Sequence, residues 1–248
     1  MTHEILDVSI KPINYLSATH QILIWAREGS SRIVFAANVH MLMEAHDSPA
    51  YKKIINSADI VTPDGMPLVW MMRVKGHPDQ QRVYGPTLML HVLESAAREN
   101  IPVGFYGSSP QVLQSLLARM QSKFPNLKIA YSFSPPFQEI NQEEDAEIIK
   151  RINASFAQIL FVGLGCPKQE KWMADHRGRI NAVMLGVGAA FDFHAGIKLQ
   201  APAWMQNIGL EWLYRLATEP RRLWRRYLYH NPRFIVLAFF DLLGFFDK

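Results

Sequence analysis

The feature of this 248-residue sequence that most constrains its fold is a regular alternation of short apolar runs with longer helix-like segments. Six runs have the length and composition of buried strands: 33–36, 60–62, 103–106, 129–133, 159–162 and 183–187. Seven segments between them have the pattern of helices: 41–45, 50–58, 67–74, 87–99, 110–124, 143–153 and 168–176. This alternation, without internal repeats, predicts an α/β fold with a mostly parallel, Rossmann-like sheet and helices on both faces.

The alternation ends at Ala201-Pro202, where the chain turns helical and basic. We therefore expect an α/β catalytic core of residues 1–201 and a helical appendage of residues 202–248. Between positions 212 and 233 six arginines stand against one acid, Glu219, and alternate with Trp and Tyr. This mixture suits a bilayer headgroup region or a nucleic acid backbone. The apolar segment 234–246 is interrupted by Asp241 and is shorter than the roughly 20 residues of a spanning helix, so it either lies in a membrane interface or packs as an ordinary helix.

Cysteine content and the start of the chain indicate the compartment. The single cysteine, Cys166, excludes an internal disulfide and fits a reducing environment. The first residues, MTHEILDVSI, lack the basic and apolar regions of a secretory signal. We expect a cytoplasmic protein.

Five stretches bring glycines and polar residues to the starts of helices: TPDGMP at 62–67, RVYGPT at 82–87, YGSS at 106–109, GLGCPKQE at 163–170 and LGVGAAFDF at 185–193. We interpret them as strand-to-helix junctions at one edge of the sheet, where α/β proteins bind ligands. Two of these stretches also have a structural interpretation: Asp64-Gly65 as a plain turn in the first, and in the fourth Lys168 as a solvated side chain and Glu170 as a helix cap. Together the five predict an extended polar ligand. The candidate binding residues are Asn38, Gly65, Arg82, Gly85, Gly107, Ser108, Gly163, Gly165, Lys168, Glu170, Gly186, Gly188 and Asp192.

Several cofactor motifs are missing. Gly163-x-Gly165 has Lys168 where a dinucleotide fingerprint needs its third glycine, and Gly186-x-Gly188 has Phe191 there. There is also no P-loop, no G-x-S-x-G elbow and no H-E-x-x-H. His40 and His46 fall on different faces of a helix. We therefore predict no metal site and no cofactor, which disfavours a nicotinamide- or flavin-dependent oxidoreductase.

The longer motifs carry a family resemblance. The stretches ADIVTPDGMPLV, RVYGPTLM, GLGCPKQEKWM, GVGAAFDFHAG, APAWMQNIGLEWLYRL and EPRRLWRRY occur in this order. From about residue 33 to 234 the chain resembles the WecG/TagA/CpsF family of bacterial glycosyltransferases. The resemblance implies metal-independent, inverting transfer of an N-acetylmannosamine-type sugar from a UDP-sugar to a polyprenyl-diphosphate-linked sugar. It also implies a peripheral position on the inner face of the cell membrane and a role in making cell-surface polysaccharide or a teichoic-acid-type polymer.

The resemblance further implies roles for individual residues. The family's general base falls on Asp64, its site glutamine on Gln169, and its appendage arginines on Arg215, Arg222 and Arg225. Inverting transfer needs one positioned carboxylate and neutralisation of the departing diphosphate. Because the chain has no Asp-x-Asp metal element, we expect helix N-termini and arginines to supply that neutralisation.

Two positions depart from the family pattern. Ala36 stands where members usually have threonine, and Gln200 where they usually have arginine. Both leave the donor open among UDP-N-acetylmannosamine, its uronic acid and UDP-glucose. The acceptor sugar and the polymer are open too, and a homo-oligomer is possible; we expect no nucleic acid partner. The remaining alternative class is a non-catalytic nucleic-acid or membrane adaptor that uses the basic C-terminus.

Overall fold

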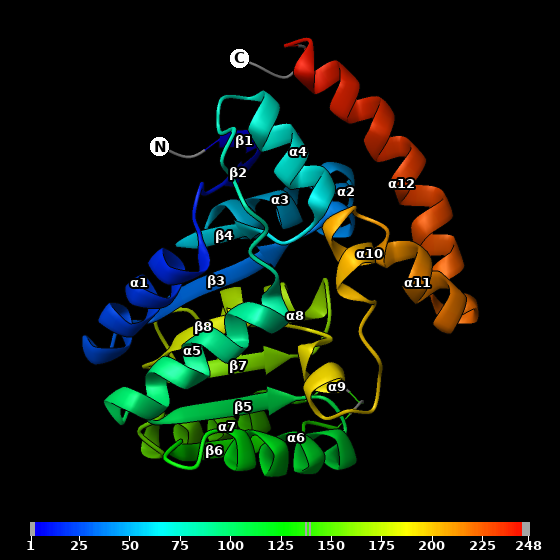
Figure 1. Ribbon diagram of the computed structural model, residues 1–248. Helices are drawn as coiled ribbons and strands as arrows, with labels where there is room; N and C mark the ends of the chain where they lie inside the picture. Colours follow the sequence, from blue (N-terminus) through cyan, green and yellow to red (C-terminus); the bar gives the residue numbers. More distant parts are fainter. Residues whose placement is uncertain (1–2, 137, 139, 245–248) are drawn as a thin grey trace. The chain divides into compact units, whose positions relative to one another are not determined.

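The computed structural model describes residues 3–136, 138 and 140–244 (Figure 1). It has the predicted α/β fold, with a six-stranded sheet in the order β4-β3-β8-β7-β5-β6, flanked by helices. The strands of this sheet are β3 (Arg32–Ala37), β4 (Ile60–Pro63), β5 (Val103–Gly107), β6 (Ile129–Phe133), β7 (Ile159–Gly163) and β8 (Val183–Gly186). Each of the six predicted strands is confirmed to within one residue at either end.

The chain divides into two compact units. The first unit comprises the described residues of Met1–Asn14, Ala36–Tyr84 and Gln200–Lys248, and the second comprises Tyr15–Phe35 and Gly85–Leu199. Strand β3 contributes residues to both units. The C-terminal helices therefore belong to the same compact unit as residues 36–84. The association of these helices with a membrane stays a prediction.

The second unit is built on parallel strands, with β8 between β3 and β7, and β5 between β7 and β6. Every residue of β5 and of β8 is buried. Since alternate residues of a strand point to opposite faces, both faces of these strands are covered. The helices of this unit are α1 (Tyr15–Arg27), α5 (Gly85–Glu99), α6 (Pro110–Lys123), α7 (Gln142–Ala154), α8 (Lys168–Asp175) and α9 (Ala190–His194).

Two helix starts follow the expected side-chain chemistry. The Ser109 hydroxyl accepts a hydrogen bond from the Val112 N–H at the start of α6. At the start of α7, Asn141 accepts from the Glu144 N–H while the Glu144 carboxylate accepts from the Asn141 N–H. These bonds use backbone groups that the first helical turn leaves without partners.

The first unit begins with a hairpin that the sequence analysis did not predict. Strands β1 (His3–Ile5) and β2 (Val8–Ile10) pair antiparallel around Leu6 and Asp7, both with positive φ. The Lys11 N–H then donates to the Val61 carbonyl, which ties the hairpin to β4. The adjoining helices are α2 (Val39–Asp47), α3 (Pro49–Asn56) and α4 (Met66–Val74).

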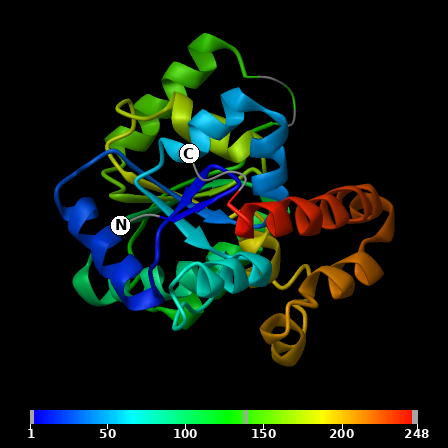
Figure 2. The ribbon, with the colours of Figure 1, turned by 90° about the horizontal axis from the view of Figure 1, so that it is seen from above.

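Three helices complete the first unit: α10 (Ala203–Asn207), α11 (Glu211–Thr218) and α12 (Pro220–Leu242), coloured orange to red in Figure 2. Helix α12 packs against α2, α4 and α11. Near its end, the buried Asp241 carboxylate pairs with the Lys75 ammonium group at 2.8 Å. Lys75 also donates to the Glu4 carbonyl at 3.0 Å. These contacts explain the aspartate in the apolar segment 234–246, because it anchors α12 to α4.

None of the helices in the described part of the chain combines the length and apolarity needed to cross a bilayer. The apolar segment continues α12 as far as Leu242. Its positions 245 and 246 lie outside the described residues.

Candidate active site

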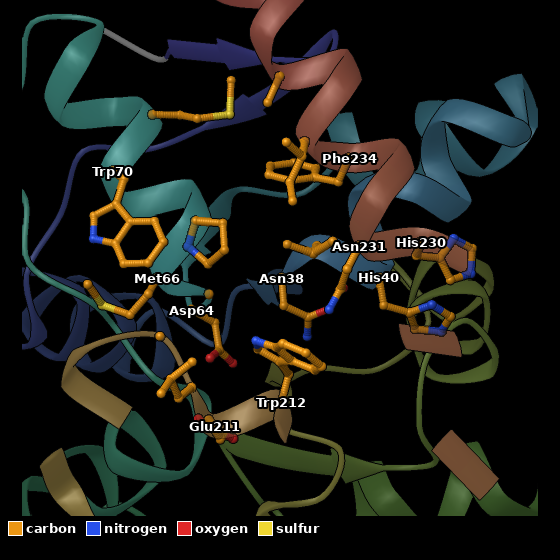
Figure 3. A pocket seen from close by; sticks show the side chains of 18 of the residues that line it. Asn38, His40, Asp64, Met66, Trp70, Glu211, Trp212, His230, Asn231 and Phe234 are labelled. Atoms are coloured by element: carbon orange, nitrogen blue, oxygen red, sulfur yellow. The ribbon is translucent and has the colours of Figure 1, made fainter. Parts of the chain in front are cut away.

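A cavity of about 620 Å³ lies within the first unit (Figure 3). Its lining comes from the loops after β3 and β4, from the start of α2, from α4, from Arg82 and Tyr84, and from α10, α11 and α12 with the chain that joins α10 to α11. Of the residues predicted for the site, it brings together Asn38, Asp64, Gly65, Arg82 and Arg215.

Asp64 is positioned by the paired ends of two strands. The N–H groups of Asp64 and Gly65 both donate to the Ala37 carbonyl, at 2.9 and 3.1 Å. A Cβ atom at Gly65 would lie 3.4 Å from the Asn38 Cα, so a small residue suits this close approach. The side chain of Asn38 caps α2 by accepting from the Met41 N–H. The Asp64 carboxylate therefore projects from backbone held at two points rather than from a loose turn.

Arg82 joins Asp64 to the C-terminal part of the chain. Its Nη2 atom lies 3.1 Å from Oδ1 of Asp64 and 2.6 Å from Oε2 of Glu211 on α11. Its Nε–H also donates to the Asp64 carbonyl. The guanidinium carbon lies 4.0 Å from the ring centroid of Tyr84, whose hydroxyl donates to Oε1 of Glu211 at 3.0 Å.

The charges of Asp64, Arg82 and Glu211 shift the pKa values of the groups beside them. Burial alone would lower the pKa of Arg82, but the carboxylates of Asp64 and Glu211 hold it above its ordinary value. Burial, together with the same two carboxylates, raises the pKa of Tyr84. Tyr84 therefore remains a hydrogen-bond donor, and the Arg82 charge is shared by two carboxylates.

Arginines on α11 and α12 divide into two groups. Arg215 and Arg226 line the cavity. Helix α12 begins at Pro220 as expected, but Arg222 is paired with Glu219 at 2.7 Å, and Arg225 is exposed beside Trp224. The structure therefore places neither Arg222 nor Arg225 in the cavity wall.

The far part of the cavity is apolar. Trp70, Met71 and Val74 of α4 line it together with Phe234 and Leu242 of α12. Figure 3 shows Trp70 and Phe234 at one end and Asp64 and Glu211 at the other. The cavity thus combines a charged end with an apolar end.

Gln169 and Glu170 lie in the second unit and are buried. The Gln169 side chain donates to Oε1 of Glu170 and accepts from the Gly188 N–H, each at 2.9 Å. The amide therefore ties the start of α8 to the loop after β8. Glu170 does not form a capping box there, because the residue before the helix is Pro167, which has no N–H to donate.

Several predicted binding glycines of the second unit have a packing role. A Cβ atom on Gly107 would lie 2.6 Å from the Gly163 carbonyl group, one on Gly163 2.7 Å from the Phe191 ring, and one on Gly186 2.6 Å from Nε2 of Gln169. Only glycine fits these approaches without rearrangement. The strand ends at the candidate edge are therefore tightly packed.

The other predicted residues of this unit are spread along its strand ends and helix starts. Ser108 donates its N–H to the Gly163 carbonyl, and Lys168 is exposed. Asp192 pairs with Lys198 at 3.2 Å. Gly165 has open space where a Cβ would lie, and Gly188 has only Oε1 of Gln169 nearby.

Gly85 starts α5 after a loop, so the stretch 82–87 is not the strand-to-helix junction that we expected.

Several polar residues of the cavity are not among the predicted site residues, including Glu211, Tyr84 and Arg226. The sequence held a signal for Arg226, since it follows Arg222 by four residues in a predicted helix. Glu211 lies far from Arg82 along the chain, and no spacing rule connects them.

Comparison with known proteins agrees with the motifs. The model of the family described as "Glycosyl transferase WecG/TagA/CpsF family" matches residues 3–246. Over 228 residues the chain is 31% identical to the N-acetylglucosaminyldiphosphoundecaprenol N-acetyl-beta-D-mannosaminyltransferase of Bacillus spizizenii. The match covers 88% of this chain and 86% of that relative.

Proposed function

Because the chain belongs to the WecG/TagA/CpsF family and is a glycosyltransferase, we propose that it transfers an N-acetylmannosamine-type sugar from a UDP-sugar to a polyprenyl-diphosphate-linked sugar. We further propose that the transfer inverts configuration and needs no metal. The relative's name supports the transferred sugar and the acceptor, since it specifies an N-acetylmannosaminyl group and N-acetylglucosaminyldiphosphoundecaprenol.

The two-ended cavity of the first unit is the observation that carries the acceptor assignment. A polyprenyl-diphosphate-linked sugar has a long apolar chain, a doubly charged linkage and a polar sugar. The apolar end, with Trp70 and Phe234, matches the lipid, whereas Arg215 and Arg226 match the diphosphate. The sugar would then lie toward Asp64.

Asp64 is the proposed general base. In a single displacement the acceptor hydroxyl attacks the anomeric carbon of the donor, that hydroxyl loses its proton to the carboxylate, and UDP departs with the electrons of the broken bond. Arg82 keeps Asp64 oriented through contacts with both its side chain and its carbonyl. Arg222 and Arg225, which the resemblance includes in the site, stay predictions.

The donor is assigned to the carboxyl ends of the second unit's strands. There the start of α6 and the start of α8 present backbone N–H groups and positive helix ends, which favour phosphate. Lys168 is exposed at the start of α8 and adds a positive charge. Ala36 and Gln200 keep UDP-glucose and the uronic acid donor as alternatives within this proposal.

Helix α12 is the proposed contact with the cytoplasmic face of the membrane. Its exposed residues include large apolar and aromatic side chains: Trp224, Leu228, Tyr229, Ile235, Val236, Phe239, Phe240 and Leu242. Exposed arginines lie in its first turns. Aromatic and basic residues of this kind favour the headgroup region of anionic bilayers.

A donor screen tests this function. UDP release is measured with a short-chain lipid-diphosphate-linked N-acetylglucosamine acceptor and each of several UDP-sugars, with and without EDTA. We expect acceptor-dependent UDP release with UDP-N-acetylmannosamine that persists in EDTA. The proposal fails if none of the UDP-sugars supports acceptor-dependent release, and its metal-independent part fails if EDTA abolishes turnover.

A further inference from the structure

Three side chains with metal-binding atoms meet between α2 and α12 of the first unit. His40 and Glu44 lie one helical turn apart on α2, and His230 projects from α12 (Figure 3 labels both histidines). Oε1 of Glu44 lies 3.8 Å from Nδ1 of His40 and 3.5 Å from Nε2 of His230. One ligand atom from each residue falls within 4.8 Å of the others. Two imidazoles and a carboxylate thus converge on one point.

Both histidines carry a buried nitrogen without a hydrogen-bond partner in the described part of the chain. These atoms are Nδ1 of His40 and Nδ1 of His230. His230 as a whole is only 8% exposed. Buried polar atoms in folded proteins nearly always bind protein, water or an ion, so His40 Nδ1, which faces the Glu44 carboxylate, is short of one partner.

We propose that His40, Glu44 and His230 bind a Zn²⁺ ion that holds α12 against α2. Two imidazoles and one glutamate are a known zinc ligand set, which leaves the fourth position to water. Ligand atoms around tetrahedral zinc lie about 3.3 Å apart. The separations of 3.8 and 3.5 Å from the Glu44 oxygen exceed this by a few tenths of an ångström, and the ligand atoms of the two histidines lie within 4.8 Å of each other, so side-chain shifts must bring the three ligands together around the ion.

The proposed ion borders the cavity, which His40 and His230 both line, but it takes no part in the proposed transfer step. Its ligands do not include Asp64, Arg82 or Glu211, and its effect is to join two helices that already pack together. The inference therefore does not depend on the identity of the sugar donor. A site with two imidazole ligands favours Zn²⁺ over Mg²⁺, because Mg²⁺ prefers oxygen ligands in an octahedral arrangement.

Zinc binding to the full-length, untagged protein tests the proposal. The protein is freed of metal with EDTA, dialysed, and titrated with ZnCl₂ by calorimetry and by thermal unfolding. We expect one equivalent to bind in the micromolar range. At a zinc concentration about 100 times the dissociation constant, the unfolding midpoint should rise by roughly 5 °C, because zinc binds only the folded site. MgCl₂ should give no shift.

Variants decide whether these three residues hold the ion. His230→Gln and Glu44→Gln should each lose the zinc-dependent shift, while the matched control His46→Gln, on the same helix but outside the cluster, should keep it. Unfolding midpoints of the metal-free variants show that each one folds. A parent protein without a zinc-dependent shift would overturn the proposal, and so would an equal shift in His230→Gln and Glu44→Gln.

Discussion

Oε2 of Glu211 on α11 lies 2.6 Å from Nη2 of Arg82, the same nitrogen that contacts Oδ1 of Asp64 at 3.1 Å. A single guanidinium group thus connects the proposed base to the C-terminal helices of the first unit. Tyr84 adds a second link by donating to the other carboxylate oxygen of Glu211. This arrangement makes Glu211 a positioning residue for Arg82 and, through it, for Asp64.

Removing the charge of Glu211 should impair turnover. Glu211→Gln keeps a group that accepts from Tyr84 but weakens the contact with Arg82, so Asp64 is held less accurately. We expect kcat to fall roughly tenfold. Steady-state kinetics measure this, with Glu147→Gln as the matched control, because Glu147 pairs with the exposed Arg151 away from the cavity. Equal kcat values for Glu211→Gln and the parent would remove the positioning role.

Arg226 should matter more than an exposed arginine of the same helix. Arg226→Ala removes a charge from the cavity wall and should lower turnover by about 10²-fold in detergent with a short-chain acceptor. Arg221→Ala, which changes an exposed side chain in the first turn of α12, should stay within a few-fold of the parent. If both variants lose the same activity, the effect belongs to the helix as a whole and not to the cavity.

The buried ion pair near the end of α12 predicts a stability effect. Asp241→Leu leaves the Lys75 ammonium group largely buried without its carboxylate and should destabilise the protein by about 3 kcal/mol. The double variant Lys75→Met/Asp241→Leu should recover most of that loss, because no charge is then left alone. Denaturant unfolding measures both. A double variant no more stable than Asp241→Leu would contradict this explanation.

His194 should make the protein less stable in mild acid. Burial lowers its pKa, with Lys123 acting in the same direction and the hydrogen bond to the Pro86 carbonyl opposing it. The unfolded chain therefore binds this proton at a higher pH than the folded protein, and stability falls as the pH drops below about 6.5. Unfolding measured from pH 7.5 to 5 should show a shallower loss for His194→Gln. The exposed-site control His20→Gln should retain the parent's slope, and an unchanged slope in His194→Gln would refute the prediction.

The main elements of the fold were accessible from local patterns. Strands such as 103–106 and 159–162 are continuous apolar runs because both of their faces are covered, and Ser109 and Asn141 mark helix starts by their own hydrogen bonds. The hairpin β1–β2 lacks such a signal, since Leu6 and Asp7 turn the chain with positive φ and without glycine. Helix α1 was not predicted either, although its sequence held a signal: its buried residues Ala18, Ile22 and Ala26 recur at every fourth position, as on one face of a helix.

The candidate site was only partly accessible from the sequence. The TPDGMP stretch identifies Asp64, because its place after a strand is a local property. The partners of Arg82 depend on how α11 packs, which no local pattern encodes. Likewise, Gly107 and Gly163 were interpreted as ligand-binding glycines, although their contact with each other and with Phe191 gives them a packing role.

The most direct test of the account is the turnover of Asp64→Asn. This change keeps the shape of the side chain and removes the charge that accepts the proton. We predict a fall in kcat of about 10²–10⁴-fold, with UDP-sugar binding measured by calorimetry close to that of the parent. Turnover within a few-fold of the parent would contradict the account and leave Asp64 as part of a structural turn.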